Sequence, residues 1–177
     1  MARPMRRVVT GTDAAGKSVI AMDTASPHAL ELPGMPGLVL TNLWVTDGSP
    51  ADNSGTADAA ARTVVLEPPA GGSIFRVVDF PPDKDLLGKM DRGTAFEAMG
   101  AHGAMDRDAS RHPGMHKTRT VDYALVLDGE IWALMDEGEL LLKAGDCLIQ
   151  RGTNHAWANR SDRPCRVAFI LIDARPL

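Results

Sequence analysis

Two histidines and one aspartate in the second half of the chain could bind a metal or move a proton. His116 and Asp122 lie in the segment HKTRTVD, and His155 begins the segment HAWAN. Residues an even number of positions apart share one face of a strand, so His116 and Asp122 would point to the same side. Two imidazoles and a carboxylate leave open positions on a metal ion, and the same groups can act as acid and base. If the face of His155 looks into the same barrel interior, we expect His116, Asp122 and His155 to point into one cavity.

Other polar and aromatic side chains are predicted to join these three as a substrate pocket. Thr118 and Thr120 share the face of His116, and Trp157 could stack on a planar substrate beside His155. The guanidinium of Arg76 has the fork geometry that binds a carboxylate. The predicted pocket residues are Arg76, Thr118, Thr120, Gln150, Trp157 and Asn159.

Short β-branched runs, separated by Gly, Pro, Asp and Asn, must position these residues. Many short strands at this spacing indicate an antiparallel sandwich or barrel, and only Thr94–Met99 is typical of a helical turn. The fold class is therefore all-β. The predicted strands are Arg7–Thr10, Ser18–Met22, Leu38–Thr46, Thr63–Leu66, Ser73–Phe80, Thr118–Leu127, Glu130–Met135, Glu139–Leu142, Asp146–Gln150, Ala156–Asn159 and Arg166–Ile172.

Two stretches interrupt the strand pattern. Residues 47–61 are rich in Ser, Gly, Asp and Ala, which indicates a solvated excursion without chemistry. Residues 81–113 are long for a connection inside a compact domain, which favours a lid or a pocket-lining role.

Composition excludes several classes of protein. A chain of 177 residues with 44% hydrophobic content suits one domain with a real core. The net charge is −4 and the basic residues are dispersed, so nucleic acid is not an expected partner. Cys147 and Cys165 are too few for a disulfide framework, and the apolar runs are too short to span a bilayer. We expect a cytoplasmic protein with reduced thiols.

Two motifs at these positions resemble the motifs of the cupin superfamily. The first cupin motif has two ligand histidines one residue apart, then a glutamate and a glycine. His116, Thr118, Asp122 and Gly129 fall at that spacing. The second motif has a Gly-Asp turn, then a glycine, a histidine and an asparagine. The matching residues are Gly145, Asp146, Gly152, His155 and Asn159.

The resemblance is more specific for a group of small cupins that includes proteins of fungal biosynthetic clusters. It implies a jelly-roll barrel, or double-stranded β-helix, over residues 73–174, with 1–70 as an N-terminal strand extension of a single domain. Cupins of this kind often dimerise through N-terminal strands. Strands before Thr63 could not bury both faces against one small barrel, so we expect a homodimer.

Thr118 departs from the motif and leaves the cofactor open. A hydroxyl is a poor substitute for imidazole as a ligand, and Asp122 is shorter than the glutamate of the motif. A divalent ion (Fe, Mn or Zn) held by His116, Asp122 and His155 is one hypothesis, with lyase, isomerase, decarboxylase or dioxygenase chemistry on a small organic molecule. In a second hypothesis, Asp122 and His155 are the catalytic acid and base without a metal. In a third, the pocket binds a ligand without turnover.

Overall fold

The computed structural model describes residues 4–101, 103–108 and 111–176, and most of them lie in strands and their connections. The strands, in chain order, are β1 (Arg6–Thr12), β2 (Ser18–Ala25), β3 (Ala29–Glu31), β4 (Val39–Thr46), β5 (Ser73–Phe80), β6 (Thr120–Asp128), β7 (Glu130–Met135), β8 (Glu139–Lys143), β9 (Cys147–Arg151), β10 (His155–Ala158) and β11 (Cys165–Asp173). The helical segments are α1 (Asp83–Leu86), the 3₁₀ turn η1 (Leu87–Lys89) and α2 (Arg92–Ala98).

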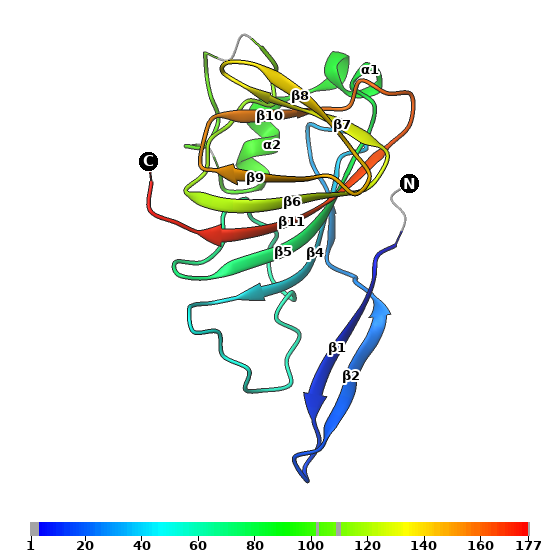
Figure 1. The fold of residues 1–177 in the computed structure, drawn as a ribbon, viewed down its shortest axis with the longest axis vertical. Helices are drawn as coiled ribbons and strands as arrows, with labels where there is room; N and C mark the ends of the chain where they lie inside the picture. Colours follow the sequence, from blue (N-terminus) through cyan, green and yellow to red (C-terminus); the bar gives the residue numbers. More distant parts are fainter. Residues whose placement is uncertain (1–3, 102, 109–110, 177) are drawn as a thin grey trace.

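Two antiparallel sheets form the barrel. One has the strand order β3-β4-β5-β11-β6-β9 and the other has the order β10-β7-β8. The two sheets curve around a common interior, as Figure 1 shows. This arrangement confirms the predicted all-β, jelly-roll fold class. Since β3 and β4 belong to the same sheet as β5, part of the predicted N-terminal extension is built into the barrel.

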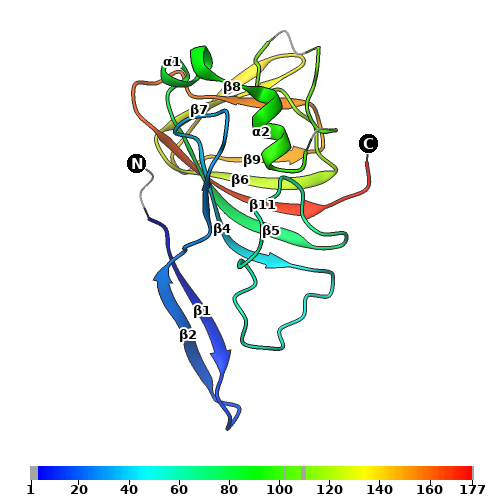
Figure 2. The same ribbon diagram turned by 180° about the vertical axis from the view of Figure 1, so that it is seen from behind.

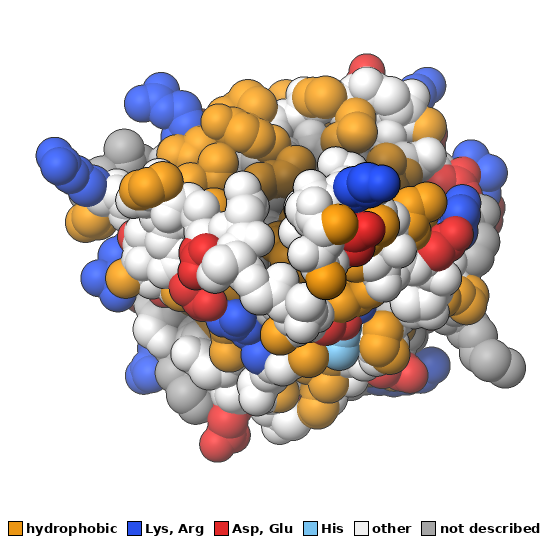
Figure 3. Space-filling model, turned by 90° about the horizontal axis from the view of Figure 1, so that it is seen from below, with side chains coloured by type: hydrophobic (Ala, Val, Ile, Leu, Met, Phe, Trp, Pro, Cys, Tyr) orange, Lys and Arg blue, Asp and Glu red, His pale blue; other side chains and the backbone are white. Residues whose placement is uncertain are grey.

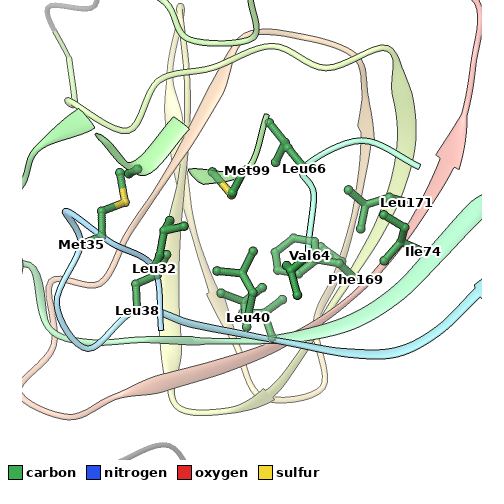
Figure 4. Close-up of a cluster of buried hydrophobic side chains, with 14 of the residues drawn as sticks. Leu32, Met35, Leu38, Leu40, Val64, Leu66, Ile74, Met99, Phe169 and Leu171 are labelled. Carbon is green, nitrogen blue, oxygen red and sulfur yellow. The ribbon is translucent and has the colours of Figure 1, made fainter. Parts of the chain in front are cut away.

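Alternation along the strands separates an inner from an outer face. In β6, Asp122, Ala124 and Val126 are buried while Tyr123 and Leu125 are exposed. The inner faces contribute to an apolar core that also contains side chains from the connections, such as Leu32 and Met99 (Figure 4). Polar residues of β6 therefore face the same interior as the apolar core.

The predicted strand Thr63–Leu66 is wrong, and β3 was not predicted. No ladder forms at Thr63–Leu66, although Val64 and Leu66 are buried and the Leu66 N–H donates to the Met99 carbonyl at 3.1 Å. An apolar run bounded by turn residues satisfies the same pattern whether it pairs with a strand or packs as an irregular wall. Hydrophobic burial, without strand pairing, holds this segment in place.

Helical turns and a tight loop close one side of the core. Asp91 caps α2 through the Thr94 N–H, and its own N–H donates to the Gly34 carbonyl at 2.7 Å. Gly34 has a φ of 77°, and a Cβ there would collide with the Asp91 carbonyl. This contact fixes the segment with Leu32 and Met35 against α2.

The hairpin β1–β2 stands apart from the barrel in both ribbon views (Figures 1 and 2). Only its base is tied down: Arg7 donates to the Leu43 carbonyl and to Asp58 at 2.8 Å each. Farther out, Val8 and Ile20 are 48% and 68% exposed. We call residues 6–25 the arm.

Hydrophobic side chains are also exposed on the barrel surface. Viewed from the end that carries the arm, they gather in patches among charged residues (Figure 3). Across β5, β11, β6 and β9, the residues Phe75, Ile170, Tyr123 and Ile149 are paired in register.

Within the described ranges, no helix is both long and apolar enough to cross a membrane.

Candidate functional site

An internal cavity of about 130 Å³ lies between the two sheets, and most of its wall is apolar. The barrel strands supply part of the wall, and residues 81–113, for which a lid or pocket-lining role was predicted, supply seven further lining residues. The polar and charged residues on the wall are Arg76, Asp83, His112, His116, Thr118, Asp122 and His155. An engineered apolar cavity of similar size, about 150 Å³, accommodates benzene.

Backbone pairing brings His116 and His155 together. Each donates its N–H to the carbonyl of the other at 2.9 Å, so the two residues form an isolated antiparallel bridge. Side chains directly opposite in such a pair lie on the same face. The ring centroids are 4.3 Å apart.

The same tautomer is imposed on both imidazoles. His116 Nδ1 lies 2.8 Å from the Gly114 carbonyl, and His155 Nδ1 lies 2.9 Å from the Thr153 carbonyl. A carbonyl can only accept, so each Nδ1 carries the proton and each Nε2 presents a lone pair. In the described part of the chain, neither Nε2 has a hydrogen-bond partner. The pair can therefore accept a proton or bind a metal ion.

Burial keeps both imidazoles neutral. Desolvation lowers the pKa of His155 to about 3, with a further contribution from His116, and desolvation also lowers the pKa of His116. Aromatic rings remove much of the water: Phe96 packs edge-on against His116, and Trp157 packs edge-on against His155. The Nε2 lone pair of His155 stays available well below neutral pH, and that of His116 is protonated less readily than in a free imidazole.

Asp122 also lines the cavity, and its carboxyl group titrates in an unusual range. Burial raises its pKa to about 6, against the lowering effects of a hydrogen bond from Thr120 and the charge of Arg76. Its Oδ1 is buried without a hydrogen-bond partner. A carboxyl group in this state can serve as a proton donor in mildly acidic solution.

The three predicted metal ligands do not form one ligand set. Within the described residues, no group of three or more His, Cys, Asp or Glu side chains is placed to hold a metal ion. Thr118, at the position of the second motif histidine, lines the cavity but hydrogen-bonds to Thr120 at 2.7 Å. The two imidazoles alone would offer two ligands, fewer than the three protein ligands typical of catalytic zinc sites. All three residues share the cavity, but they do not share a metal-binding geometry.

The structure brings six predicted site residues to this cavity and places three elsewhere. Arg76, Thr118 and Trp157 line it together with the two histidines and Asp122. The exceptions are Thr120, Gln150 and Asn159.

Local hydrogen bonds hold two of these three side chains away from the cavity wall. The Gln150 side chain donates to the Thr153 carbonyl at 2.9 Å. The Asn159 side chain donates to the Phe80 and Arg163 carbonyls and accepts from Ser161. Both are buried structural amides. Thr120 instead lines a second hollow.

His112 and Asp83 line the cavity but were not predicted as site residues. The His112 Nδ1 accepts the Gly114 N–H at 3.0 Å, so the proton sits on Nε2, which is buried without a partner. Asp83 lies 3.8 Å from that atom. The Pro113-Gly114 sequence indicates a turn, which could place His112 at the mouth of the pocket. No pattern in the sequence indicates that His112 lies beside Asp83.

The second hollow, of about 680 Å³, opens at the surface and shares Met99 and Thr118 with the cavity. Its exposed basic side chains are Lys117, Arg119, Arg151 and Arg175, which we call the basic mouth. Among the described residues, one acidic residue, Glu67, lines this second hollow.

Comparisons with known proteins all relate this chain to cupin proteins. A family model for the cupin domain matches residues 104–172. Phomopsin biosynthesis cluster protein C' of Diaporthe leptostromiformis is 33% identical over 99% of this chain and 82% of its own length. A cupin-domain-containing oxidoreductase of Hypocrea virens is 25% identical over 97% of this chain and 77% of its own length.

One solved structure, a Cupin 2 conserved barrel domain protein from Salinispora arenicola, covers 81% of this chain and 82% of its own, with 12% identity and a TM-score of 0.43. The relationship to the phomopsin cluster protein extends over nearly the whole chain, including the arm and the cavity wall. The chain belongs to the cupin superfamily.

Proposed function

We propose that this cupin is an enzyme that moves a proton on a small, mainly apolar carbonyl compound held in the barrel cavity, as isomerases and lyases do. The observation that carries the proposal is the convergence, on one apolar cavity, of two imidazoles with unpartnered Nε2 atoms and a carboxyl group that titrates near pH 6. Acid and base on one cavity wall are the requirement for such a reaction.

The roles follow from the protonation states. His155 Nε2 accepts a proton from the carbon next to the substrate carbonyl, and protonated Asp122 gives its proton to the carbonyl oxygen, so that an enol forms. His155 then returns its proton to another carbon of the conjugated enol, the enol hydroxyl returns its proton to Asp122, and the isomerised carbonyl compound is released. Because the pKa of Asp122 is about 6, the acid is present below that pH and lost above it. The rate is therefore expected to fall as the pH rises through about 6.

Deuterium exchange tests the proposal without knowledge of the product. The protein is incubated in D₂O with a panel of small cyclic ketones, and deuterium uptake at the carbon next to the carbonyl is measured by mass spectrometry. Wild type should catalyse uptake, whereas His155→Gln and Asp122→Asn should reduce it by about 10²-fold or more. His28→Gln is the control, because His28 lies outside the cavity and pairs with Asp58. Binding of a ketone without exchange would instead support a ligand-binding cupin without turnover.

A second candidate is metal-dependent redox chemistry, which the name of the Hypocrea virens relative favours. It requires a bound metal, which the two imidazoles would have to retain. Elemental analysis of untagged protein, purified without added metal, tests the second candidate: stoichiometric Fe or Mn supports it, whereas zinc, which has no redox chemistry, does not. Thr118→His should increase metal affinity by restoring the second imidazole of the motif, which this chain lacks, while His155→Ala should abolish any metal binding.

A further inference from the structure

We propose that the natural ligand of the cavity is an anion, a small carboxylate with an apolar body, which passes the basic mouth and pairs with Arg76. The inference rests on the proposed function to the extent that the cavity is the ligand site, and it adds the chemical class of the ligand. Two observations support it: Arg76 differs from the other buried arginines in its partners, and exposed basic residues gather around the second hollow.

Three arginines are buried in the described structure, and two of them are paired. Arg166 makes two hydrogen bonds of 2.7 Å to Asp79, and Arg7 binds Asp58. Arg76 is only 2% exposed, yet its side chain forms no ion pair within 4.0 Å with any described residue. A buried charge is costly unless a counter-charge and hydrogen bonds compensate it. Arg76 therefore lacks the partner that the other two possess.

The hydrogen bonds of Arg76 leave part of its guanidinium without an acceptor. Its Nη2 donates to the Val65 carbonyl, while its Nε is buried without a partner. Asp122 acts on Arg76 through its charge, but its Oδ1 is also unpartnered. A carboxylate entering the cavity would supply acceptors for a guanidinium that has donors to spare.

The basic mouth lies beside the cavity and would attract an anion toward it. The chain has a net charge of −4, yet four exposed cations border this one hollow. The hollow shares Met99 and Thr118 with the cavity, and it is lined by Val65, whose carbonyl binds Arg76. Clustered charge of one sign raises the local concentration and association rate of oppositely charged ligands.

The rest of the cavity wall defines the body of the ligand. Side chains such as Leu40, Val78, Phe169 and Leu171 line the space beside Arg76. These apolar groups offer no partner for a polyhydroxylated or highly charged molecule. A single ring or short branched chain with one carboxylate fits both the volume and the chemistry.

Benzoate and its uncharged analogue benzamide separate charge from shape. We expect wild type to bind benzoate at least about tenfold more tightly than benzamide in calorimetric titrations, because the difference is a charge-assisted pair. Arg76→Met should remove this preference, and Arg76→Lys, which keeps the charge and loses the fork, should reduce it. In Arg151→Gln/Arg175→Gln, benzoate should associate more slowly, with less effect of added salt.

Arg166→Met is the matched control, because Arg166 is equally buried but does not line the cavity. It should lower the thermal midpoint by breaking its pair with Asp79 and leave the preference for benzoate intact. Arg76→Met should keep or raise the midpoint, since it removes a buried charge that forms no ion pair within 4.0 Å among the described residues.

Equal binding of benzoate and benzamide, failure of both to bind, or a large loss of stability in Arg76→Met would each overturn the assignment of Arg76. The deuterium-exchange assay with neutral ketones is independent of these results, so failure of the carboxylate proposal is distinguishable from failure of the proposed reaction.

Discussion

The hydrogen bond at Nδ1 determines what each imidazole can do. With Nδ1–H bound to a backbone carbonyl, His116 and His155 both present lone pairs to the cavity, whereas His112 presents an N–H. The cavity wall thus contains two acceptors and one donor of the same residue type. Side-chain type alone predicts none of this difference, because it depends on which backbone group each ring meets.

The buried state of His155 predicts how the stability of the protein depends on pH. Its pKa is about 3 in the folded chain and about 6.5 in the unfolded chain, so the unfolded state takes up a proton first as the pH falls. Stability from the neutral imidazole is present above pH 6.5 and is lost progressively toward pH 3. Relative to His155→Gln, wild type should lose about 2 kcal/mol of unfolding free energy between pH 7.5 and pH 5.

Urea unfolding of both proteins at the two pH values measures this difference. The titration of Asp122 has the opposite sign, but it occurs in both proteins and cancels to first order in the comparison. A difference between wild type and His155→Gln that does not change with pH would show that the imidazole titrates alike in the folded and unfolded chains.

Strand parity predicted which residues of the site face inward, but not what each side chain binds. His116, Asp122 and His155 reach one cavity because alternation and the two motifs place them there. Gln150 and Asn159 obey the same parity, yet short hydrogen bonds to nearby loops hold their amides. Their partners are fixed by turn geometry that no periodicity encodes.

At the scale of elements, the regular strands were predictable and the irregular walls were not. The runs Ser73–Phe80 and Glu130–Met135 are strands with the predicted bounds, because turn residues flank β-branched or apolar stretches. Residues 32–38 and 63–66 are held by burial and by single backbone contacts such as that of Gly34. Patterns of period two carry no information about such segments, although both border the cavity.

Asn159 is expected to be a structural residue of the β10–β11 connection. Asn159→Ala removes donors to the Phe80 and Arg163 carbonyls and the acceptor for Ser161, so it should cost about 2–4 kcal/mol of unfolding free energy. Asn159→Asp keeps the acceptor for Ser161. At a pH where the new carboxyl group is protonated, it should lower the unfolding free energy by less than Asn159→Ala does. Urea midpoints measure both effects. Retained stability in Asn159→Ala would contradict this role.

At the scale of the whole molecule, the arm exposes apolar side chains that a second copy of the chain could cover. An isolated two-stranded hairpin is marginal in water, and this one exposes Val8, Val19 and Ile20. The row formed by Phe75, Ile170, Tyr123 and Ile149 offers an apolar surface on the outer face of the large sheet. We propose a homodimer in which each arm packs on its partner.

Light scattering at micromolar concentration should give twice the mass of the chain. Removal of residues 1–25 should shift the protein toward the monomer, and Ile20→Asp should weaken the dimer without touching the barrel. As a control, Leu140→Asp changes another exposed apolar residue, on β8 of the small sheet, and should leave the mass unchanged. A monomeric wild type at this concentration would reject the dimer.

In the proposed homodimer, the arm would also make the thermal stability of the protein depend on its concentration. A hairpin that packs on another molecule adds little to the stability of its own barrel. The packing of the arm therefore stabilises the protein only while the two copies are associated. Dilution then lowers the melting temperature, and two laboratories working at different concentrations would report different values for one sequence. The arm would lose its protection against hydrogen exchange before the barrel does, which makes it the first part of the chain to report dissociation.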